Sequence, residues 1–444
     1  MHVEPVLLYI FGILIVLIGL AASIALHELG HLIPAKLFGV RVGQYMIGFG
    51  PTLWSKRRGE TEYGFKAIPL GGYISMAGMY PPVASGGKAR TASTGFFQTL
   101  VQDARTANAE TIQEGEADRT FYRLPIWKRV IIMFGGPLMN LVIAVVLFAV
   151  VLSGFGVQQV STTIATVNKC LLPATSDRQS CEAGDPAAPG AAAGIEPGDQ
   201  FVAINKTSIS SWEQATEFIR DSPGKPLTII VERDGENRAL TATPFLTERH
   251  VAAEDGSTVL NAAGEPVTER VGMLGITAAR ELTQQPITAV LPAVWDNVSR
   301  VGIMILNLPQ RLIDVAEAAF GPEERDPNGP LSVVGVGRIA GEISSIDTIP
   351  ILERASYLVG LIASVNVALF VFNLIPLMPL DGGHIAGALW EGIRRFFAKL
   401  SKRGDSGPVD AAKLIPLTFT VVILLGGMSL LLIYADIVKP ISIL

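Results

Sequence analysis

The stretch Ala25-Leu26-His27-Glu28-Leu29-Gly30-His31 decides how the rest of the chain is interpreted. Two histidines four residues apart lie on one face of a helix, so both imidazoles can reach a single metal ion. Glu28 directly follows the first histidine, where a carboxylate can take a proton from a metal-bound water. An ordinary surface helix can carry this pattern by chance. Here, however, it ends an uncharged run over 6–26, where polar residues are costly and need a functional reason. The stretch therefore predicts zinc-dependent hydrolysis.

The composition is that of a membrane protein. The 444 residues are 49% hydrophobic and 17% charged, with a mean hydropathy of +0.42, whereas soluble domains carry about 25% charged residues. The net charge of −5 gives no reason to expect nucleic acid as a partner. The first apolar run lacks a basic segment before it and leads into the histidine stretch, so we interpret it as a span and not a signal peptide.

Four apolar runs are long enough to cross a bilayer, over 6–26, 130–157, 355–380 and 414–435. Basic residues gather between the first and second runs and after the third: Lys36, Arg41, Lys56, Arg57, Arg58, Arg123, Lys128, Arg129, Arg394, Arg395, Lys399, Lys402 and Arg403. The positive-inside rule places both of these loops in the cytoplasm and residues 158–354 outside. The C-terminal ends of the first and third spans are then expected on the cytoplasmic face.

Residues 286–320 form a possible fifth span, but charged residues interrupt their helical apolar spacing. We expect an amphipathic helix that lies on membrane lipid at the outer surface, with a plain linker helix as the alternative. A span here would bring Asp381 out on the face opposite to His27, and the two could not meet.

The segment after the first span predicts a β-hairpin over 51–68, with its turn at Arg57-Arg58-Gly59-Glu60. Glycines flank Tyr73 after the hairpin and indicate a bend or a close backbone approach. Residues 81–117 show no clear periodicity and are expected to form a mobile cytoplasmic insert.

A small outer domain is predicted over 160–245, with strands at 164–167, 200–204, 227–232 and 239–243 and a helix at 212–220. The run Ala193-Gly194-Ile195-Glu196-Pro197-Gly198-Asp199 resembles the bacterial type of PDZ domain. Such domains bind an extended peptide as an added strand, and the alternative is a spacer that binds nothing. An insert at 171–188 departs from the compact pattern. We expect Cys170 and Cys181 to form a disulfide, because both fall outside and can close a short loop.

A catalytic zinc usually has three protein ligands, so the two histidines need a partner. Asp381 lies at the end of the third span, in the run Leu380-Asp381-Gly382-Gly383-His384, and a carboxylate in that place requires a cation. Pro376 and Pro379 break the helix before it, and the two glycines allow a sharp bend.

These motifs resemble those of the site-2 protease family of intramembrane zinc metalloproteases, close to its bacterial members with an extracytoplasmic PDZ domain. The resemblance runs nearly end to end. It rests on the histidine stretch, on Leu380-Asp381-Gly382, on Asn373 with the two prolines, and on Gly136-Pro137-Leu138-Met139-Asn140 at the second span. The hairpin and the outer loop Gly329-Pro330-Leu331-Ser332 also resemble family elements. Some bacterial relatives carry two PDZ domains, and this chain has room for one.

The resemblance implies a role for each matching residue. His27, His31 and Asp381 are the expected ligands of one Zn²⁺, and Glu28 is the expected general base. Asn373 is expected to hold the substrate backbone. Asn140 and Pro137 are expected to keep the second span against the core, and together with Tyr73 they complete the residues expected at the substrate.

The expected fold class is therefore a polytopic α-helical membrane protein with four transmembrane helices, a membrane-associated β-hairpin and an extracytoplasmic α+β PDZ domain. The expected parts are the first span with the histidines, the cytoplasmic hairpin region, the second span, the PDZ domain, an outer linker with the amphipathic helix, the third span, a cytoplasmic loop and the fourth span, over 1–35, 36–127, 128–157, 160–245, 246–350, 351–384, 385–412 and 413–437.

The expected activity is hydrolysis of a peptide bond inside single-span membrane proteins of the bacterial inner membrane, after an upstream site-1 protease has trimmed them. Anti-sigma factors are expected substrates of this kind. Clearance of remnant signal peptides uses the same chemistry and stays open. A membrane binding protein with a PDZ domain and a vestigial metal site is the alternative from another class, and the intact residue set speaks against it. A metal transporter would need a polar pathway across several spans.

Overall fold

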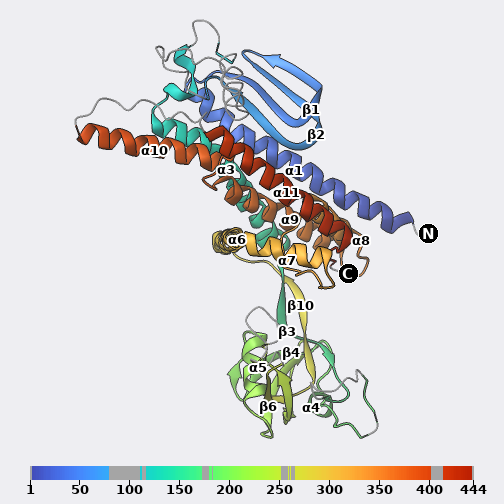
Figure 1. Ribbon diagram of the computed structural model, residues 1–444. Helices are drawn as coiled ribbons and strands as arrows, with labels where there is room; N and C mark the ends of the chain where they lie inside the picture. Colours follow the sequence, from blue (N-terminus) through green and yellow to red (C-terminus); the bar gives the residue numbers. More distant parts are fainter. Residues whose placement is uncertain are drawn as a thin grey trace. The chain divides into compact units, whose positions relative to one another are not determined.

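The computed structural model describes residues 3–79, 111–112, 117–172, 180–182, 184–251, 259, 261, 266–401 and 414–442. They form two compact units, one of Met1–Phe155 with Gln285–Leu444 and one of Gly156–Gln284 (Figure 1). Each unit is described by itself. The insert expected over 81–117 lies almost entirely outside the described residues.

The first unit is helical apart from one hairpin. Its helices are α1 (Val3–Leu37), α3 (Ile126–Ala149) with a π-helical turn (Val150–Phe155), α6 (Val290–Leu306), α7 (Leu308–Phe320), α8 (Val333–Ser345), α9 (Ile351–Asn373), α10 (Asp381–Leu400) and α11 (Ile415–Val438). Short 3-10 turns occur at Ala117–Arg119, Phe121–Arg123 and Ile287–Ala289. Within the described ranges, five helical segments are long and apolar enough to cross a membrane: Pro5–Leu37, Ile126–Phe155, Ile287–Leu306, Ile351–Asn373 and Ile415–Val438. The chain is therefore an integral membrane protein.

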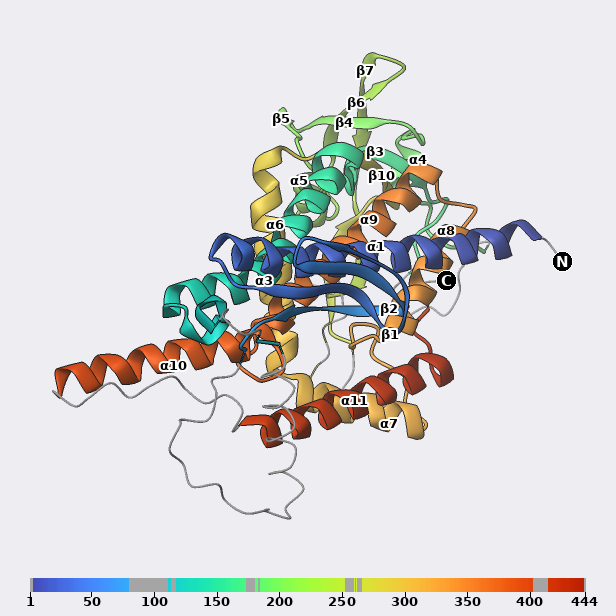
Figure 2. The ribbon, with the colours of Figure 1, turned by 90° about the horizontal axis from the view of Figure 1, so that it is seen from above.

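The segment Ile287–Leu306, with α6, is the one that the expected four spans leave out, and it is the least apolar of the five. Figure 1 shows α6 end-on while α1 and α11 run across the page, and Figure 2 again shows α6 crosswise to α1. Val290 and Val294 are buried, whereas Trp295 is 71% exposed. One face of α6 thus packs on the bundle and the other exposes apolar side chains.

Small residues let the helices of the bundle approach closely. A Cβ atom at Gly12 of α1 would lie 2.3 Å from the carbonyl oxygen of Ala340 in α8. A Cβ atom at Gly30 would lie equally close, 2.3 Å, to the carbonyl oxygen of Gly135 in α3. Glycine at these positions is required because any side chain would push the helices apart.

The hairpin consists of β1 (Val42–Arg58) and β2 (Thr61–Met76), joined at Gly59, where φ is +65°. It is longer than the expected 51–68, because each strand bends back on its partner. Residues 44–47 pair both with 62–65 and with 72–75. Leu53 and Trp54 lie near the tip and are 71% and 54% exposed, so the hairpin presents apolar side chains to its surroundings.

The second unit contains a mostly antiparallel sheet with strand order β10-β3-β4-β6-β7. Its elements are β3 (Val157–Val167), α4 (Pro189–Ala192), β4 (Gln200–Ile204), β5 (Thr207–Ser208), α5 (Trp212–Arg220), β6 (Leu227–Arg233), β7 (Glu236–Ala242), β8 (Phe245–His250), β9 (Thr268–Met273) and β10 (Ile276–Thr283). Phe201, Ile229 and Leu274 are fully buried members of one core. The unit extends beyond the expected 160–245, because β10 returns to pair with β3 and places Thr283 opposite Val157.

The expected disulfide is confirmed: Cys170 and Cys181 are bonded, with their Cα atoms 5.9 Å apart. The bridge closes the insert that begins after β3. Part of that insert, 173–179 and residue 183, lies outside the described residues.

Candidate metal centre

The helix face predicted from the sequence brings His27 and His31 together. Their Nε2 atoms are 3.3 Å apart, and each lies 3.3 Å from the Oδ2 atom of Asp381. The three atoms thus form an equilateral triangle. Zinc bonds to nitrogen and oxygen are about 2.0–2.1 Å long, so donors at three corners of a tetrahedron are separated by about 3.3–3.4 Å. The donor spacing therefore fits zinc.

The environment of the carboxylate supports the same fit. Asp381 Oδ2 is buried and has no hydrogen-bond donor among the described residues. A buried carboxylate oxygen without a partner is costly unless it binds a cation. In the part of the chain that the structure describes, His27, His31 and Asp381 are the one group of three such side chains able to share a metal ion.

Hydrogen bonds orient both imidazole rings. Nδ1 of His31 lies 2.7 Å from the carbonyl oxygen of Ile132, which can only accept a hydrogen bond. Nδ1 of His31 therefore carries a proton, and Nε2 is left with the lone pair that a metal needs. Nδ1 of His27 lies 3.1 Å from the Asn140 amide. If the buried Oδ1 of Asn140 accepts the Nδ1 proton of His27, this ring has the same tautomer.

Glycines in α3 make room for the histidine rings. A Cβ atom at Gly136 would lie 2.2 Å from Nε2 of His31 and 2.8 Å from Cε1 of His27. Sequence reasoning used Gly136 only as part of a motif and did not assign Gly30 or Gly135 a role. The available signal was a pair of glycines inside an apolar helix, where glycine needs a packing reason.

A tight turn delivers Asp381 to the histidines. Helix α9 ends at Asn373, and α10 begins with Asp381 itself. A Cβ atom at Gly382 would lie 2.4 Å from the carbonyl oxygens of Leu374 and Ile375. The predicted need for glycine after Asp381 thus has a concrete cause, since the first turn of α10 packs on the backbone that precedes it.

A buried ion pair, which sequence reasoning missed, holds α10 against α3. Arg129 Nη2 donates to Glu391 Oε1 at 2.7 Å, and the two side chains are 8% and 1% exposed. Arg395 also contacts Glu391, at 2.9 Å. Because the pair lies on the helix that begins with Asp381, it restricts how that carboxylate can move.

Glu28 lies beside the hairpin. A Cβ atom at Gly72 in β2 would lie 3.0 Å from Cγ of Glu28 and 3.1 Å from Cγ2 of Ile24. Tyr45 of β1 donates its hydroxyl proton to the Ala25 carbonyl oxygen at 2.7 Å and so ties the hairpin to α1. Residues 72–75 pair with 44–47 along one edge, and no pairing of their other edge occurs among the described strands.

The remaining predicted residues lie at varying distances from this centre. Asn373 donates its amide proton to the Leu369 carbonyl oxygen of its own helix at 2.9 Å. Pro137 is buried in α3, one residue after Gly136. Tyr73 donates its hydroxyl proton to Gln44 Oε1 at 3.2 Å, within the hairpin. Their expected contacts with substrate stay predictions, whereas Asn140 contacts a histidine of the metal group.

Two histidines, a buried carboxylate and an adjoining glutamate, set on helices apolar enough to cross a membrane, define a zinc metalloprotease of membrane type. Residues 15–405 match the family model described as Peptidase family M50. The chain belongs to this family, the site-2 proteases.

Curated relatives agree with the assignment. "Zinc metalloprotease Rip1" of Mycobacterium tuberculosis strain H37Rv is 34% identical over 98% of this chain and 100% of the relative. Rip1 of Mycolicibacterium smegmatis is 35% identical over 98% of this chain and 99% of that relative. "Metalloprotease MmpA" of Caulobacter vibrioides is 28% identical over 86% of this chain and 88% of that relative.

Proposed function

We propose that this chain cleaves a peptide bond within the membrane-spanning segment of single-span membrane proteins that an upstream site-1 protease has already trimmed. Anti-sigma factors are the proposed substrates, as in regulated intramembrane proteolysis. The observation that carries the proposal is the triangle of His27, His31 and Asp381, because its three donors come from helices α1 and α10 of an apolar bundle.

We propose four spans, α1, α3, α9 and α11, in the bacterial inner membrane. The crosswise position of α6 favours a helix at the membrane surface. The closeness of His27 to Asp381 favours the same topology, since one more crossing between α3 and α9 would separate them. Under the positive-inside rule the metal centre then lies toward the cytoplasm and the second unit lies outside.

Zinc, when bound, would polarise the scissile carbonyl and lower the pKa of a water to about 7. Glu28 is placed to accept that proton and to return it to the leaving amine. A helical substrate hides its peptide bonds and must unwind first. The unpaired edge of 72–75 lies beside Glu28 and could hold the unwound backbone as an added strand.

We propose that the second unit is a PDZ domain. Its antiparallel sheet, the helix α5 and the turn over 194–199, where Gly194 and Gly198 have φ of +79° and +95°, support the proposal.

The central test separates metal binding from catalysis. His27→Ala, His31→Ala and Asp381→Ala should each lose zinc or bind it much more weakly, because each removes one of three ligands. Glu28→Gln should keep the zinc and lose activity, because Glu28 contacts the water and not the metal. Zinc content by mass spectrometry and cleavage of co-expressed single-span proteins measure the two effects. Full zinc occupancy in Asp381→Ala would contradict the ligand assignment.

A further inference from the structure

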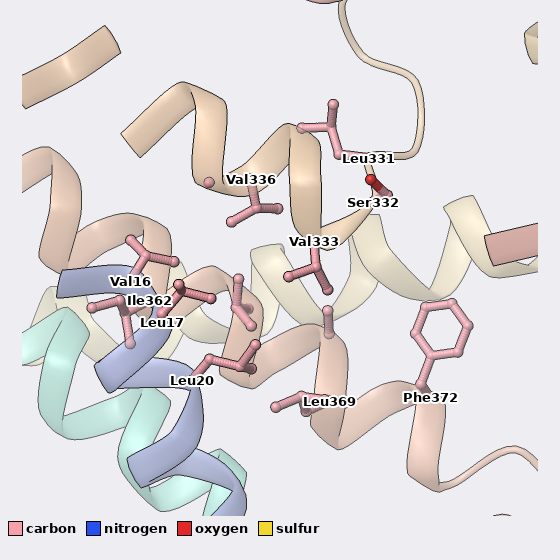
Figure 3. Close-up of a pocket in the computed structure, with 13 residues that line it drawn as sticks. Val16, Leu17, Leu20, Leu331, Ser332, Val333, Val336, Ile362, Leu369 and Phe372 are labelled. Atoms are coloured by element: carbon pink, nitrogen blue, oxygen red, sulfur yellow. The ribbon is translucent and has the colours of Figure 1, made fainter. Parts of the chain in front are cut away.

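An apolar cavity of about 260 Å³ lies between α1, α8 and α9. Figure 3 shows Leu17 and Leu20 of α1, Val333 and Val336 of α8, and Leu369 of α9 converging on it. Of the lining side chains that the structure describes, only that of Ser332 is polar, and its hydroxyl donates to Asp436. The cavity therefore offers an apolar ligand shape complementarity and no free polar anchor.

The cavity continues into the metal centre along two helices. On α1, Leu17, Leu20, Ile24 and Glu28 follow one another at helical spacing, so they share one face. Glu28 comes eight residues after Leu20, which corresponds to about 12 Å along the helix axis. On α9, Phe372 lines the cavity immediately before Asn373.

The volume limits what the cavity can hold. One turn of an α-helix with its side chains is about 10–12 Å wide and 5.4 Å long, or roughly 400–600 Å³. The cavity is too small for a helix. Apolar cavities of about 150 Å³ already accept a benzene ring, so 260 Å³ is enough for one large apolar side chain.

We propose that this cavity is a specificity subsite that takes one large apolar side chain of the substrate's membrane-spanning segment. The proposal rests on the function proposed above. An unwound chain advances about 3.3 Å per residue, so the 12 Å from Leu20 to Glu28 places this side chain about four residues from the scissile bond. The occupied position lies on the side of the N-terminal half of α1.

Crosslinking tests the occupant directly. A photoreactive residue replaces Val336 in the full-length Glu28→Gln variant, within vesicles of phosphatidylethanolamine and phosphatidylglycerol. The probe is a single-span reporter with a leucine- and alanine-rich membrane segment. A photoreactive residue at Tyr73 serves as the control beside the metal centre. We expect both positions to crosslink the reporter, at residues about four apart.

The outcomes separate the two proposals. Crosslinks from position 73 to the reporter, with only lipid adducts from position 336, would overturn the subsite and assign the cavity to an acyl chain. Crosslinks to the reporter from neither position would count against the proposed function itself, and the subsite would fall with it.

A size-exchange experiment gives a kinetic readout. Ala368→Phe adds bulk to the cavity lining. For a reporter with phenylalanine at the subsite position, we expect KM to rise about tenfold while kcat stays within about twofold, as for changes of a few methylenes in an apolar pocket. A reporter with glycine there should lose this penalty. Val422→Phe on the exposed face of α11 is the matched control. Equal slowing of both reporters at unchanged zinc content would refute the subsite.

Discussion

At the scale of single residues, the metal centre depends on positions that carry no side chain as much as on its ligands. Gly136 illustrates this, because the nearest atom to a Cβ placed there is the metal-facing nitrogen of His31, at 2.2 Å. Real side chains do not approach so closely. Either the imidazole must turn away or α3 must move from α1.

We therefore predict that Gly136→Ala loses most of its zinc while the protein still inserts and folds. Gly427→Ala, in α11, is the control, because a Cβ atom there meets nothing within 4 Å. Zinc content after dialysis against a weak chelator measures the effect. Zinc retained by Gly136→Ala at the level of the control would show that the rings can rearrange.

The ligands themselves were predictable from the sequence, and their support was not. His27 and His31 identify themselves by spacing, and Asp381 by its place in an apolar span. The carbonyl oxygen of Ile132 has no sequence signal, because every residue has one. Asn140 was predicted for the second span and its substrate contacts, but its neighbour in the structure is His27.

At the scale of elements, α10 is the part on which the site depends most. It begins with Asp381 and is held to α3 by the buried pair of Arg129 and Glu391. Removing one partner of a buried pair leaves an uncompensated charge and costs about 3–5 kcal/mol, whereas replacing both with apolar residues is often neutral.

This asymmetry gives a prediction. Glu391→Leu leaves Arg129 buried opposite an apolar residue, so α10 should shift and zinc affinity should fall. The double variant Arg129→Met with Glu391→Leu should recover much of the affinity. Competition with a fluorescent zinc chelator measures it. Asp296→Leu breaks the exposed pair with Arg300 and should change nothing. A double variant no better than Glu391→Leu alone would show that the charges act in some other way.

In the second unit, one buried aspartate couples stability to pH. Burial alone would raise the pKa of Asp199, but two hydrogen bonds from Arg233, at 2.6 and 2.8 Å, and one from the Glu196 amide lower it below its ordinary value. A carboxyl whose pKa is lower in the folded state stabilises the fold above its unfolded pKa, about 3.9. That contribution is lost as the pH falls through the lower, folded pKa.

We predict that urea unfolding of this unit in the full-length protein has a lower midpoint at about pH 3 than at about pH 6. Trp212 stacks on Phe201 in the core and serves as the fluorescent probe once the other tryptophans are replaced by phenylalanine. Asp199→Asn should lose roughly 1.5–3 kcal/mol at neutral pH, the range for hydrogen bonds to charged groups. It should also show a weaker dependence on pH, and an unchanged dependence would exclude Asp199 as its source.

At the scale of the whole molecule, long apolar runs made the spans easy to predict, and long-range strand pairing made the second unit hard to delimit. Strand β10 carries no signal that distinguishes it from a linker. It becomes part of the unit only because it pairs with β3, more than one hundred residues earlier. The hairpin was underestimated for a similar reason, since pairing of 44–47 on both sides is a property of the folded sheet.

The pairing of β3 with β10 also defines a clean deletion. Val157 and Thr283 are paired residues, so the two ends of the unit lie next to each other. Replacing 156–284 with a short glycine-serine linker should therefore leave the first unit unstretched. A deletion of 160–245 would instead remove most of β3 and leave β10 without its partner.

This deletion tests what the second unit does for the protease. Glu28 and the metal group belong to the first unit, so zinc binding should be unchanged. We expect the unit to exclude proteins with bulky outer domains, because the disulfide-closed insert beginning after β3 departs from a standard open groove. The deletion variant should then cleave untrimmed single-span substrates that the intact protein leaves whole. If the unit instead captures a newly exposed C-terminus, trimmed substrates will be cut more slowly and untrimmed ones will stay intact. Immunoblots of co-expressed trimmed and untrimmed substrates distinguish the two results, with Glu28→Gln in the deletion background as the control for other proteases.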